Sequence, residues 1–373
     1  MTEITAAVLR ESFKPWTVEK AVLEAPRADE VLVRIVATGI CHSDMTVRDQ
    51  YLPTPLPAVL GHEGAGVVEA VGADVTHVAV GDHVVLAPAY CGECKHCASG
   101  QPMRCVQFGL LNLMAMRADG SSPICGCDGE RVGGMFFGQS SFATHSVANK
   151  RSVVKIPNDV PLALMGPLGC GLMTGSGTVL NALKPGPGSS FVVFGAGAVG
   201  LAALMAAVAS GCTPVIAVDL HDNRLKLAKE LGATHVVNAG AGDPVEAVRA
   251  ILPDGVDFSV DTSALPPVIR QAVECLGTGG RCAFIGVSKA GAEITVPVGA
   301  LINKSMGYVV EGDAVPHLFI PRLITLWRQG KFPFEKLVRY YPLADINRAV
   351  ADSESGATLK PILVIDPESP LLK

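Results

Sequence analysis

The feature that most constrains the fold is a glycine-rich segment, GAGAVG (residues 195–200), inside a long apolar run. The residues before it, FVVF, have the pattern of a buried strand, and those after it, LAALMAAVASG, have the pattern of a buried helix. No charge occurs between Lys184 and Asp219, so the run is long enough to cross a bilayer. Because the glycines interrupt it, we predict a strand, a tight turn and a helix instead of a membrane span.

The same alternation continues along the chain. Strands are expected at residues 215–220, 235–239, 257–263 and 281–287, and helices at 222–232, 244–252 and 266–276. Regular alternation of this kind predicts an α/β fold with a doubly wound parallel sheet. The chain before residue 170 is instead β-rich, with short apolar runs separated by glycine and proline. The final strand, KPILVID (360–366), lies in a tail that we expect to return and complete the first domain. The predicted boundaries are 1–171, 172–309 and 310–373.

The glycines fit a dinucleotide site. Gly195, Gly197 and Gly200 form G-x-G-x-x-G between the strand and the helix, with Val199 inside the motif. They allow the turn, the approach of a pyrophosphate and close helix packing. Asp219 ends the next strand, where a carboxylate binds ribose hydroxyls and repels a 2′-phosphate, so NAD is favoured over NADP. The alternative is a glycine-rich turn of a flavodoxin-like domain.

Four cysteines lie close together in YCGECKHCASGQPMRC (residues 90–105). Their spacing on a glycine-containing loop predicts a closed tetrahedral zinc site with a structural role. An iron–sulfur cluster is the alternative. The predicted ligands are Cys91, Cys94, Cys97 and Cys105.

Three further residues could form a second metal site if the fold brings them together. Cys41 lies in GICHSDMTVRDQ, His62 and Glu63 in LGHEGAG, and Cys170 in GPLGCGLMTG. Two cysteines and one histidine make a catalytic zinc set with one open position. Their spacing alone does not select these three, since buried cysteines are commonly core residues.

The composition limits the partners and the location. The net charge is −5 and the pI is about 6.0, so nothing indicates nucleic-acid binding. The eleven cysteines occur without a secretory signal pattern at the start, which argues against a disulfide framework. We therefore expect a cytoplasmic protein with neither a membrane nor a nucleic acid as partner.

These motifs together resemble the zinc-dependent medium-chain alcohol dehydrogenases over essentially the whole chain. GHEGAGVVEAVG, the four-cysteine loop, GPLGCGLMTG and the glycine motif carry the resemblance. CHSDMTVRDQYLPTPLPAVLGHEGAG and MFFGQSSFATHSV are similar to the aryl- or allylic-alcohol branch, that of the benzyl alcohol dehydrogenases. The resemblance implies a GroES-like catalytic domain, into which a Rossmann domain is inserted, and a homodimer or homotetramer. Residues 294–310 are the predicted subunit edge.

The resemblance also implies roles for single residues. Cys41, His62 and Cys170 would bind catalytic zinc, with Glu63 as an occasional ligand, and Asp44 would orient His62. In the cofactor site, Thr174 would back the nicotinamide ring and Arg224 would lie beside the adenosine ribose. The other residues expected to contact the cofactor are His42 and Lys360 at the pyrophosphate, and Val287.

The implied reaction is hydride transfer between a primary alcohol and NAD, which gives the aldehyde. Ser43 is placed to take the hydroxyl proton, and the family's usual relay then ends at a histidine where this chain has Thr46. Threonine can relay a proton but cannot store one at neutral pH. We predict release to a water near Thr46, because Arg48 stays protonated and a pyrophosphate would hold His42 cationic.

Two alternatives remain open at this stage. A glutathione-dependent formaldehyde dehydrogenase would need basic residues at the pocket mouth, and Arg104, Arg117 and Arg131 are available. The apolar segments LLNLMAM (110–116) and MFF (135–137) favour a ring or a terpenoid chain instead. The other alternative, a non-catalytic relative, could lose site residues, and none is lost. Cys125 and Cys127 receive no role.

Overall fold

The chain leaves its first structural unit after Cys170 and returns to it near the C-terminus. The computed structural model describes residues 1–366 and 369 and forms two units. Unit 1 comprises Met1–Cys170, Val315–Pro321 and Glu335–Lys373, and unit 2 comprises Gly171–Ala314 and Arg322–Phe334. The predicted boundaries are 171/172 and 309/310, whereas the units divide at 170/171 and 314/315, and residues 322–334 of the C-terminal segment also belong to unit 2. That segment is divided because helix α10 (Pro316–Arg328) continues through Pro321, so its second half belongs to unit 2.

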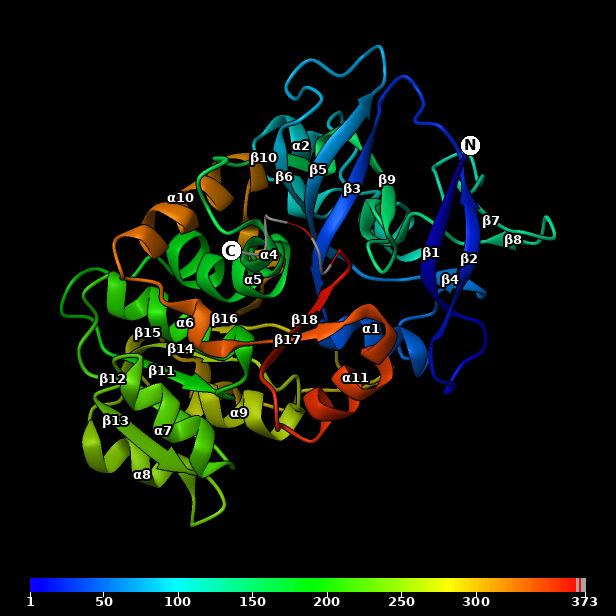
Figure 1. The fold of residues 1–373 in the computed structure, drawn as a ribbon. Helices are drawn as coiled ribbons and strands as arrows, with labels where there is room; N and C mark the ends of the chain where they lie inside the picture. The colour runs from blue at the N-terminus through cyan, green and yellow to red at the C-terminus, as the bar shows by residue number, and fades with distance from the viewer. Residues whose placement is uncertain (367–368, 370–373) are drawn as a thin grey trace. The chain divides into compact units, whose positions relative to one another are not determined.

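Unit 1 contains two antiparallel-rich sheets and short helices (Figure 1). The first sheet has the order β4-β1-β2-β7-β8. Its strands are β1 (Thr2–Leu9), β2 (Thr17–Leu23), β4 (Ala58–Val59), β7 (Ile124–Gly126) and β8 (Arg131–Val132). The second has the order β10-β6-β5-β3-β18-β17, with β9 also paired to β3. Its strands are β3 (Glu30–Gly39), β5 (Glu63–Val71), β6 (His83–Leu86), β9 (His145–Asn149), β10 (Val153–Lys155), β17 (Val338–Pro342) and β18 (Lys360–Val364).

Strand β3 is the centre of the second sheet. Its sequence, EVLVRIVATG, is rich in β-branched residues, and most of its side chains are buried. It pairs antiparallel with β5, which places Gly39 opposite Glu63, and with β18, which places Gly39 opposite Ile362. The tail thus completes the sheet that carries the residues around Glu63. The helices of this unit are α1 (His42–Arg48), α2 (Lys95–Ala98), α3 (Phe108–Leu113), α4 (Leu162–Met165) and α11 (Ile346–Glu354).

Unit 2 is built on a parallel sheet with the order β13-β12-β11-β14-β15-β16. Its strands are β11 (Phe191–Phe194), β12 (Val215–Asp219), β13 (His235–Asn238), β14 (Val256–Asp261), β15 (Leu276–Phe284) and β16 (Ser305–Tyr308). Strands β11 and β12 are buried along their whole length, as expected when helices cover both faces of a sheet. The prediction of a doubly wound sheet is confirmed.

Helices fill the connections between these strands. The predicted helices appear as α6 (Ala198–Ala209), α7 (Asp222–Glu230), α8 (Pro244–Ile251) and α9 (Pro266–Glu274). Val248 of α8 and Ala272 of α9 pack on the face of the sheet formed by Val192 and Phe194. Helix α5 (Gly171–Gly177) precedes the sheet in sequence and packs against α6.

The uncharged run between Lys184 and Asp219 forms strand β11, the glycine turn, helix α6 and strand β12. Among the described residues, no single helix has the length and apolarity to span a bilayer. One bent pair of helical segments, Leu162–Gly169 and Gly171–Leu183, is together long and apolar enough, by length and composition alone.

Candidate functional site

Cys41, His62 and Cys170 meet at one point of unit 1. Each offers one ligand atom, and the three atoms lie within 4.8 Å of one another. All three residues are buried. Cys41 caps helix α1 directly after β3, and His62 directly precedes β5, so the pairing of these two strands brings them together.

Asp44 fixes the orientation of His62. The ring Nδ1 donates to Asp44 Oδ1 at 3.0 Å, and both side chains are fully buried. Asp44 is itself held by the backbone amides of Cys41 (3.0 Å) and Gly61 (3.1 Å). This leaves His62 Nε2 as a buried nitrogen without a hydrogen-bond partner among the described residues.

The charges of this cluster favour a thiolate at Cys41 and a hydrogen-bonded imidazole at His62. Contact with the sulfur of Cys170 and with the imidazole of His62 holds the pKa of Cys41 well below its usual range, despite burial. Burial by itself would lower the pKa of His62, but the charge of Asp44 and its hydrogen bond raise it well above the ordinary value. Two sulfurs and one unpartnered imidazole nitrogen fit a tetrahedral zinc ion with one open position.

Glu63 and Lys360 form a buried ion pair next to this cluster. The ammonium group of Lys360 lies 2.9 Å from each carboxylate oxygen of Glu63 and donates to the carbonyl of Ile40 at 3.1 Å. Burial raises the pKa of Glu63 to about 7, and Lys360 opposes that shift. The contact of Lys360 with a pyrophosphate stays a prediction, and within unit 1 its ammonium group meets Glu63 and the carbonyl of Ile40. Glu63 is not part of the three-ligand cluster.

Helix α1 carries the residues predicted to move the proton. Ser43 Oγ lies 3.9 Å from Cys41 Sγ. Thr46 is only 5% exposed, and its hydroxyl donates to the carbonyl of Ser43 at 2.8 Å. Arg48 is engaged with Asp49 and with Glu354, both at 2.7 Å. Its guanidinium is therefore already bound by two carboxylates, whereas His42 is exposed.

Two aromatic rings enclose the imidazole of His62. Phe137 stacks on it with centroids 4.5 Å apart and planes at 26°, and Phe136 meets it edge-on at 5.4 Å. Phe108 contacts Phe137 edge-on at 6.2 Å. Phe137 has a left-handed backbone (φ 50°), which is strained for a bulky residue. The segment predicted to form an apolar pocket, MFF, thus lies against a candidate metal ligand.

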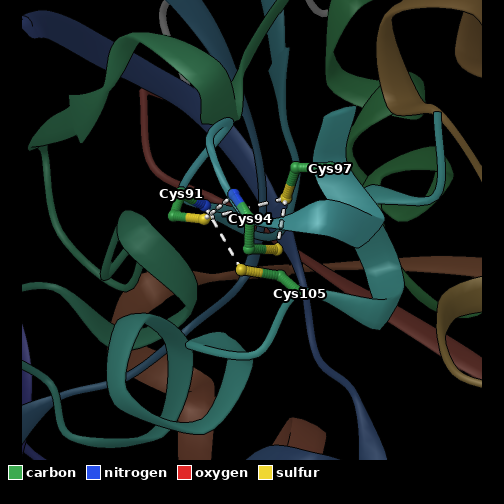
Figure 2. Close-up of side chains that lie close together, drawn as sticks. All are labelled: Cys91, Cys94, Cys97 and Cys105. Atoms are coloured by element: carbon green, nitrogen blue, oxygen red, sulfur yellow. Dashed lines mark hydrogen bonds between the residues drawn. The ribbon is translucent and has the colours of Figure 1, made fainter. Parts of the chain in front are cut away.

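The second cysteine cluster is the predicted loop (Figure 2). Its four sulfurs lie within 4.8 Å of one another. Sulfurs of Cys94 and Cys97 are 3.5 Å apart, and those of Cys91 and Cys97 are 3.9 Å apart. A tetrahedral ion with bonds of about 2.3 Å needs sulfurs about 3.8 Å apart, so the geometry fits one zinc ion better than a multi-iron cluster.

Backbone amides of the same loop stabilise these sulfurs. Cys94 N donates to Cys91 Sγ at 3.3 Å, and Gln107 N donates to Cys105 Sγ at 3.4 Å. Hydrogen bonds from the backbone of Cys97 and Val106 lower the pKa of Cys94 to about 6. The backbone of the loop thus favours a thiolate at Cys94, whereas burial raises the pKa of Cys97 to about 12 and also raises that of Cys105.

The glycine turn of unit 2 has the geometry of a phosphate site. Gly195 has φ 92°, which favours glycine, and Gly197 caps the N-terminus of α6. A side chain at Gly197 would meet no atom within 4 Å, so this position is open to a ligand. Val199 lies in the first turn of α6, and its carbonyl contacts Gly175 of α5.

Asp219 lies at the end of β12, beside the turn. Its carboxylate accepts from the amides of Ala196 (2.7 Å) and His221 (2.9 Å). Arg224 approaches it at 3.7 Å. A carboxylate has further lone pairs, so the predicted bonds to ribose hydroxyls remain available. Val287 lies three residues beyond the end of β15.

Thr174 is hydrogen-bonded to Glu311, a residue that was not predicted from the sequence. Its hydroxyl donates to the carboxylate of Glu311 at 2.9 Å. Glu311 is 9% exposed and follows β16 in the segment EGD. Glu311 followed by a glycine matches no known sequence motif, so there was no reason in the sequence to single it out.

Two of the arginines that a glutathione-dependent formaldehyde dehydrogenase would need at the pocket mouth have other partners in this structure. Arg117 is buried and pairs with Glu30 at 2.6 Å and with Glu24 at 2.8 Å, so it is not available to a glutathione carboxylate. Arg131 donates to the carbonyl of Gly120. Cys125 and Cys127 belong to neither metal cluster of the described residues.

Comparisons with known proteins agree with this geometry. The alcohol dehydrogenase GroES-like domain family matches residues 27–158, and the zinc-binding dehydrogenase family matches residues 198–311. A geraniol dehydrogenase of Castellaniella defragrans is 45% identical over 96% of this chain and 97% of its own. A crystal structure of benzyl alcohol dehydrogenase from Acinetobacter calcoaceticus is 46% identical, with TM-score 0.95 over 98% of this chain and 100% of its own. An alcohol dehydrogenase zinc-binding domain protein from Burkholderia ambifaria is 50% identical, with TM-score 0.96 over 98% and 99%.

Proposed function

Because the chain belongs to the zinc-dependent medium-chain alcohol dehydrogenase family, we propose that it interconverts primary aryl or allylic alcohols and their aldehydes with NAD. The observation that carries the substrate class is the pair of rings around His62, since Phe137 stacks on the ligand and Phe136 meets its edge. Flat π systems pack well against such rings. Geraniol and benzyl alcohol, named for two relatives, both carry the hydroxyl one carbon from a π system.

A conjugated alcohol also suits the chemistry. Loss of hydride develops positive charge at the carbinol carbon, and an adjacent double bond or ring stabilises that charge. When bound, zinc would supply Lewis acidity that lowers the pKa of the substrate hydroxyl, and NAD would accept the hydride. Cys41, His62 and Cys170 would hold that zinc.

The residues of α1 would handle the proton. Ser43 Oγ, beside Cys41 Sγ, would accept it from the alcohol hydroxyl. Thr46 is not suited to pass it on, since its own hydrogen is bonded to the carbonyl of Ser43 and its side chain is buried. We therefore propose that Ser43, which is half-buried, passes its own hydroxyl proton directly to solvent water as it accepts the proton of the alcohol, without a water held by Thr46.

We further propose a cytoplasmic homodimer or homotetramer. All eleven cysteines are free, and two thiolate clusters need reducing conditions. Strand β16 is an edge of the parallel sheet and exposes Tyr308, and the preceding segment exposes Val298 and Ile302. An unpaired apolar edge is a natural pairing surface.

The test is a matched alcohol series. Initial rates of NADH formation would be measured with ethanol, hexanol, geraniol, cinnamyl alcohol, benzyl alcohol and hydroxymethylglutathione. We expect the highest kcat/KM for the conjugated alcohols. Highest activity with the glutathione adduct would move the protein to the formaldehyde branch, and equal activity with hexanol and benzyl alcohol would contradict the aromatic-site argument.

A substitution at Phe137 tests whether the aromatic rings beside His62 cause the preference for conjugated alcohols. Phe137→Leu should lower kcat/KM for benzyl alcohol about fivefold, because one aromatic contact is worth roughly 1 kcal/mol beyond its area. The rate with hexanol should change less than threefold. Phe13→Leu, at an exposed phenylalanine, is the matched control. Zinc content must be measured in both, since Phe137 also packs on His62.

A further inference from the structure

A buried carboxylate occupies one end of the parallel sheet of unit 2. Glu311 comes three residues after β16 ends, on the side of the sheet where strands finish. Ligands of doubly wound sheets bind at this edge. Glu311 is 9% exposed, and its Oε2 accepts the hydroxyl hydrogen of Thr174.

The order of strands in the sheet indicates which half of a bound dinucleotide would lie near Glu311. Asp219, expected at the adenosine ribose, ends β12, on one side of β11. Glu311 follows β16, on the opposite side of β11, beyond β14 and β15. Since the pyrophosphate crosses at the turn after β11, the nicotinamide half must lie on the side of Glu311.

Thr174 lies close to that crossing point. It precedes Gly175, where a Cβ atom would clash with the carbonyl oxygen of Val199, so the backbone of Gly175 passes close to the glycine motif. Thr174 is the only residue of α5 that is not buried. Its hydroxyl is thus the one polar group that this helix offers to a ligand, and Glu311 fixes its direction.

The backbone around Glu311 is held in an unfavourable conformation. Glu311, Gly312 and Asp313 all have positive φ, at 47°, 65° and 47°. Asn181 donates to the carbonyl of Gly312 at 3.1 Å, which ties the segment to the helix that follows α5. At the two non-glycine residues, Glu311 and Asp313, this conformation is strained, and such strain is kept mainly at functional sites.

We propose that Glu311 is a positioning residue for the nicotinamide half of the cofactor, acting through the hydroxyl of Thr174. The proposal rests on the NAD-dependent function proposed above. It assigns to the segment 311–313 a role in cofactor recognition that neither the glycine motif nor Asp219 performs.

The test compares two ligands that differ only in the nicotinamide. Dissociation constants of NADH and ADP-ribose would be measured for wild type, Glu311→Asn and Glu311→Gln. Asparagine tolerates positive φ but is too short to reach Thr174, so we expect NADH to bind about tenfold more weakly and ADP-ribose within twofold of wild type. Glutamine keeps the length and an acceptor oxygen, so Glu311→Gln should stay within threefold for both ligands.

A second pair of variants covers a folding failure of Glu311→Asn. Thr174→Val removes the hydroxyl and should give the same selective loss for NADH. Thr178→Val, in which a hydroxyl that donates to the carbonyl of Thr174 is removed, should bind both ligands as wild type does. An equal loss for NADH and ADP-ribose, or no loss in Thr174→Val, would overturn the proposal. Binding needs no alcohol, so failure of the substrate assignment would leave this result intact.

Discussion

The two cysteine clusters of unit 1 both offer ligands for a metal ion, but one is formed by a single loop and the other by residues far apart in the sequence. The Cys91–Cys105 loop spans 14 positions, is partly exposed, and its sulfurs accept hydrogen bonds from its own backbone. The Cys41–His62–Cys170 set spans 129 positions and is fully buried, and its histidine is oriented by Asp44. A local loop can assemble wherever its chain turns, whereas the dispersed set also needs the pairing of β3 with β5 and the packing of the turn before Cys170 on these strands. The first is therefore suited to holding shape, and the second to a water-excluded reaction.

The largest effect should come from the dispersed set. Cys170→Ser should reduce kcat/KM for alcohol oxidation on the order of 10³-fold or more, because the hydroxyl of the substrate would lose its activating metal. Metal analysis should find one zinc per chain instead of two. Cys212→Ser, at a buried cysteine of unit 2, is the control. Two zincs in Cys170→Ser would contradict the ligand assignment.

Asp44→Asn should have the next largest effect. Loss of the carboxylate that fixes His62 should weaken binding of the catalytic zinc by about 10–100-fold. Competition with a chelator measures this directly. Asp49→Asn, at the end of the same helix, should bind zinc as wild type does. Unchanged affinity in Asp44→Asn would mean that packing by Phe137 is enough to orient the ring.

Removing the hydroxyl of Thr46 should have a small effect. In Thr46→Val the side chain keeps its shape, and the lost bond is the one to the carbonyl of Ser43. We expect a change in kcat/KM below about threefold and the same pH profile, as for one partly compensated hydrogen bond. A fall of tenfold or more that grows with acidity would restore Thr46 to the proton path.

The smallest effect on rate should come from the local loop. Cys97→Ser should leave kcat/KM within about twofold at temperatures where the protein is folded, while Tm falls by roughly 10 °C. Comparison of thermal unfolding with and without a zinc chelator tests whether the metal accounts for the shift. Loss of activity before any unfolding would show that the two clusters are coupled.

The difference between the clusters also explains what the sequence could predict. The loop cysteines and the glycine motif are local patterns, so their partners could be assigned from spacing alone. Cys41, His62 and Cys170 required the resemblance to a family, because only the tertiary fold brings them together: β3 pairs with β5, and the turn before Cys170 packs on both strands. The contact of Lys360 with a pyrophosphate stays a prediction, whereas its pairing with Glu63 was missed, since no local pattern shows that these two residues are neighbours in space. Glu311 was missed because its role depends on backbone conformation and on the partner it meets.

The Lys360–Glu63 pair has a consequence for the order of biosynthesis. The two residues are 297 positions apart, and all of unit 2 except its final stretch is made between Cys170 and Val315. A growing chain therefore presents Glu63 long before the cation that neutralises it exists. Burying an unpaired carboxylate is costly, so the second sheet of unit 1 should stay open until β18 is translated. All residues of unit 2 are translated before β18. Unit 2 can therefore fold before unit 1 is complete.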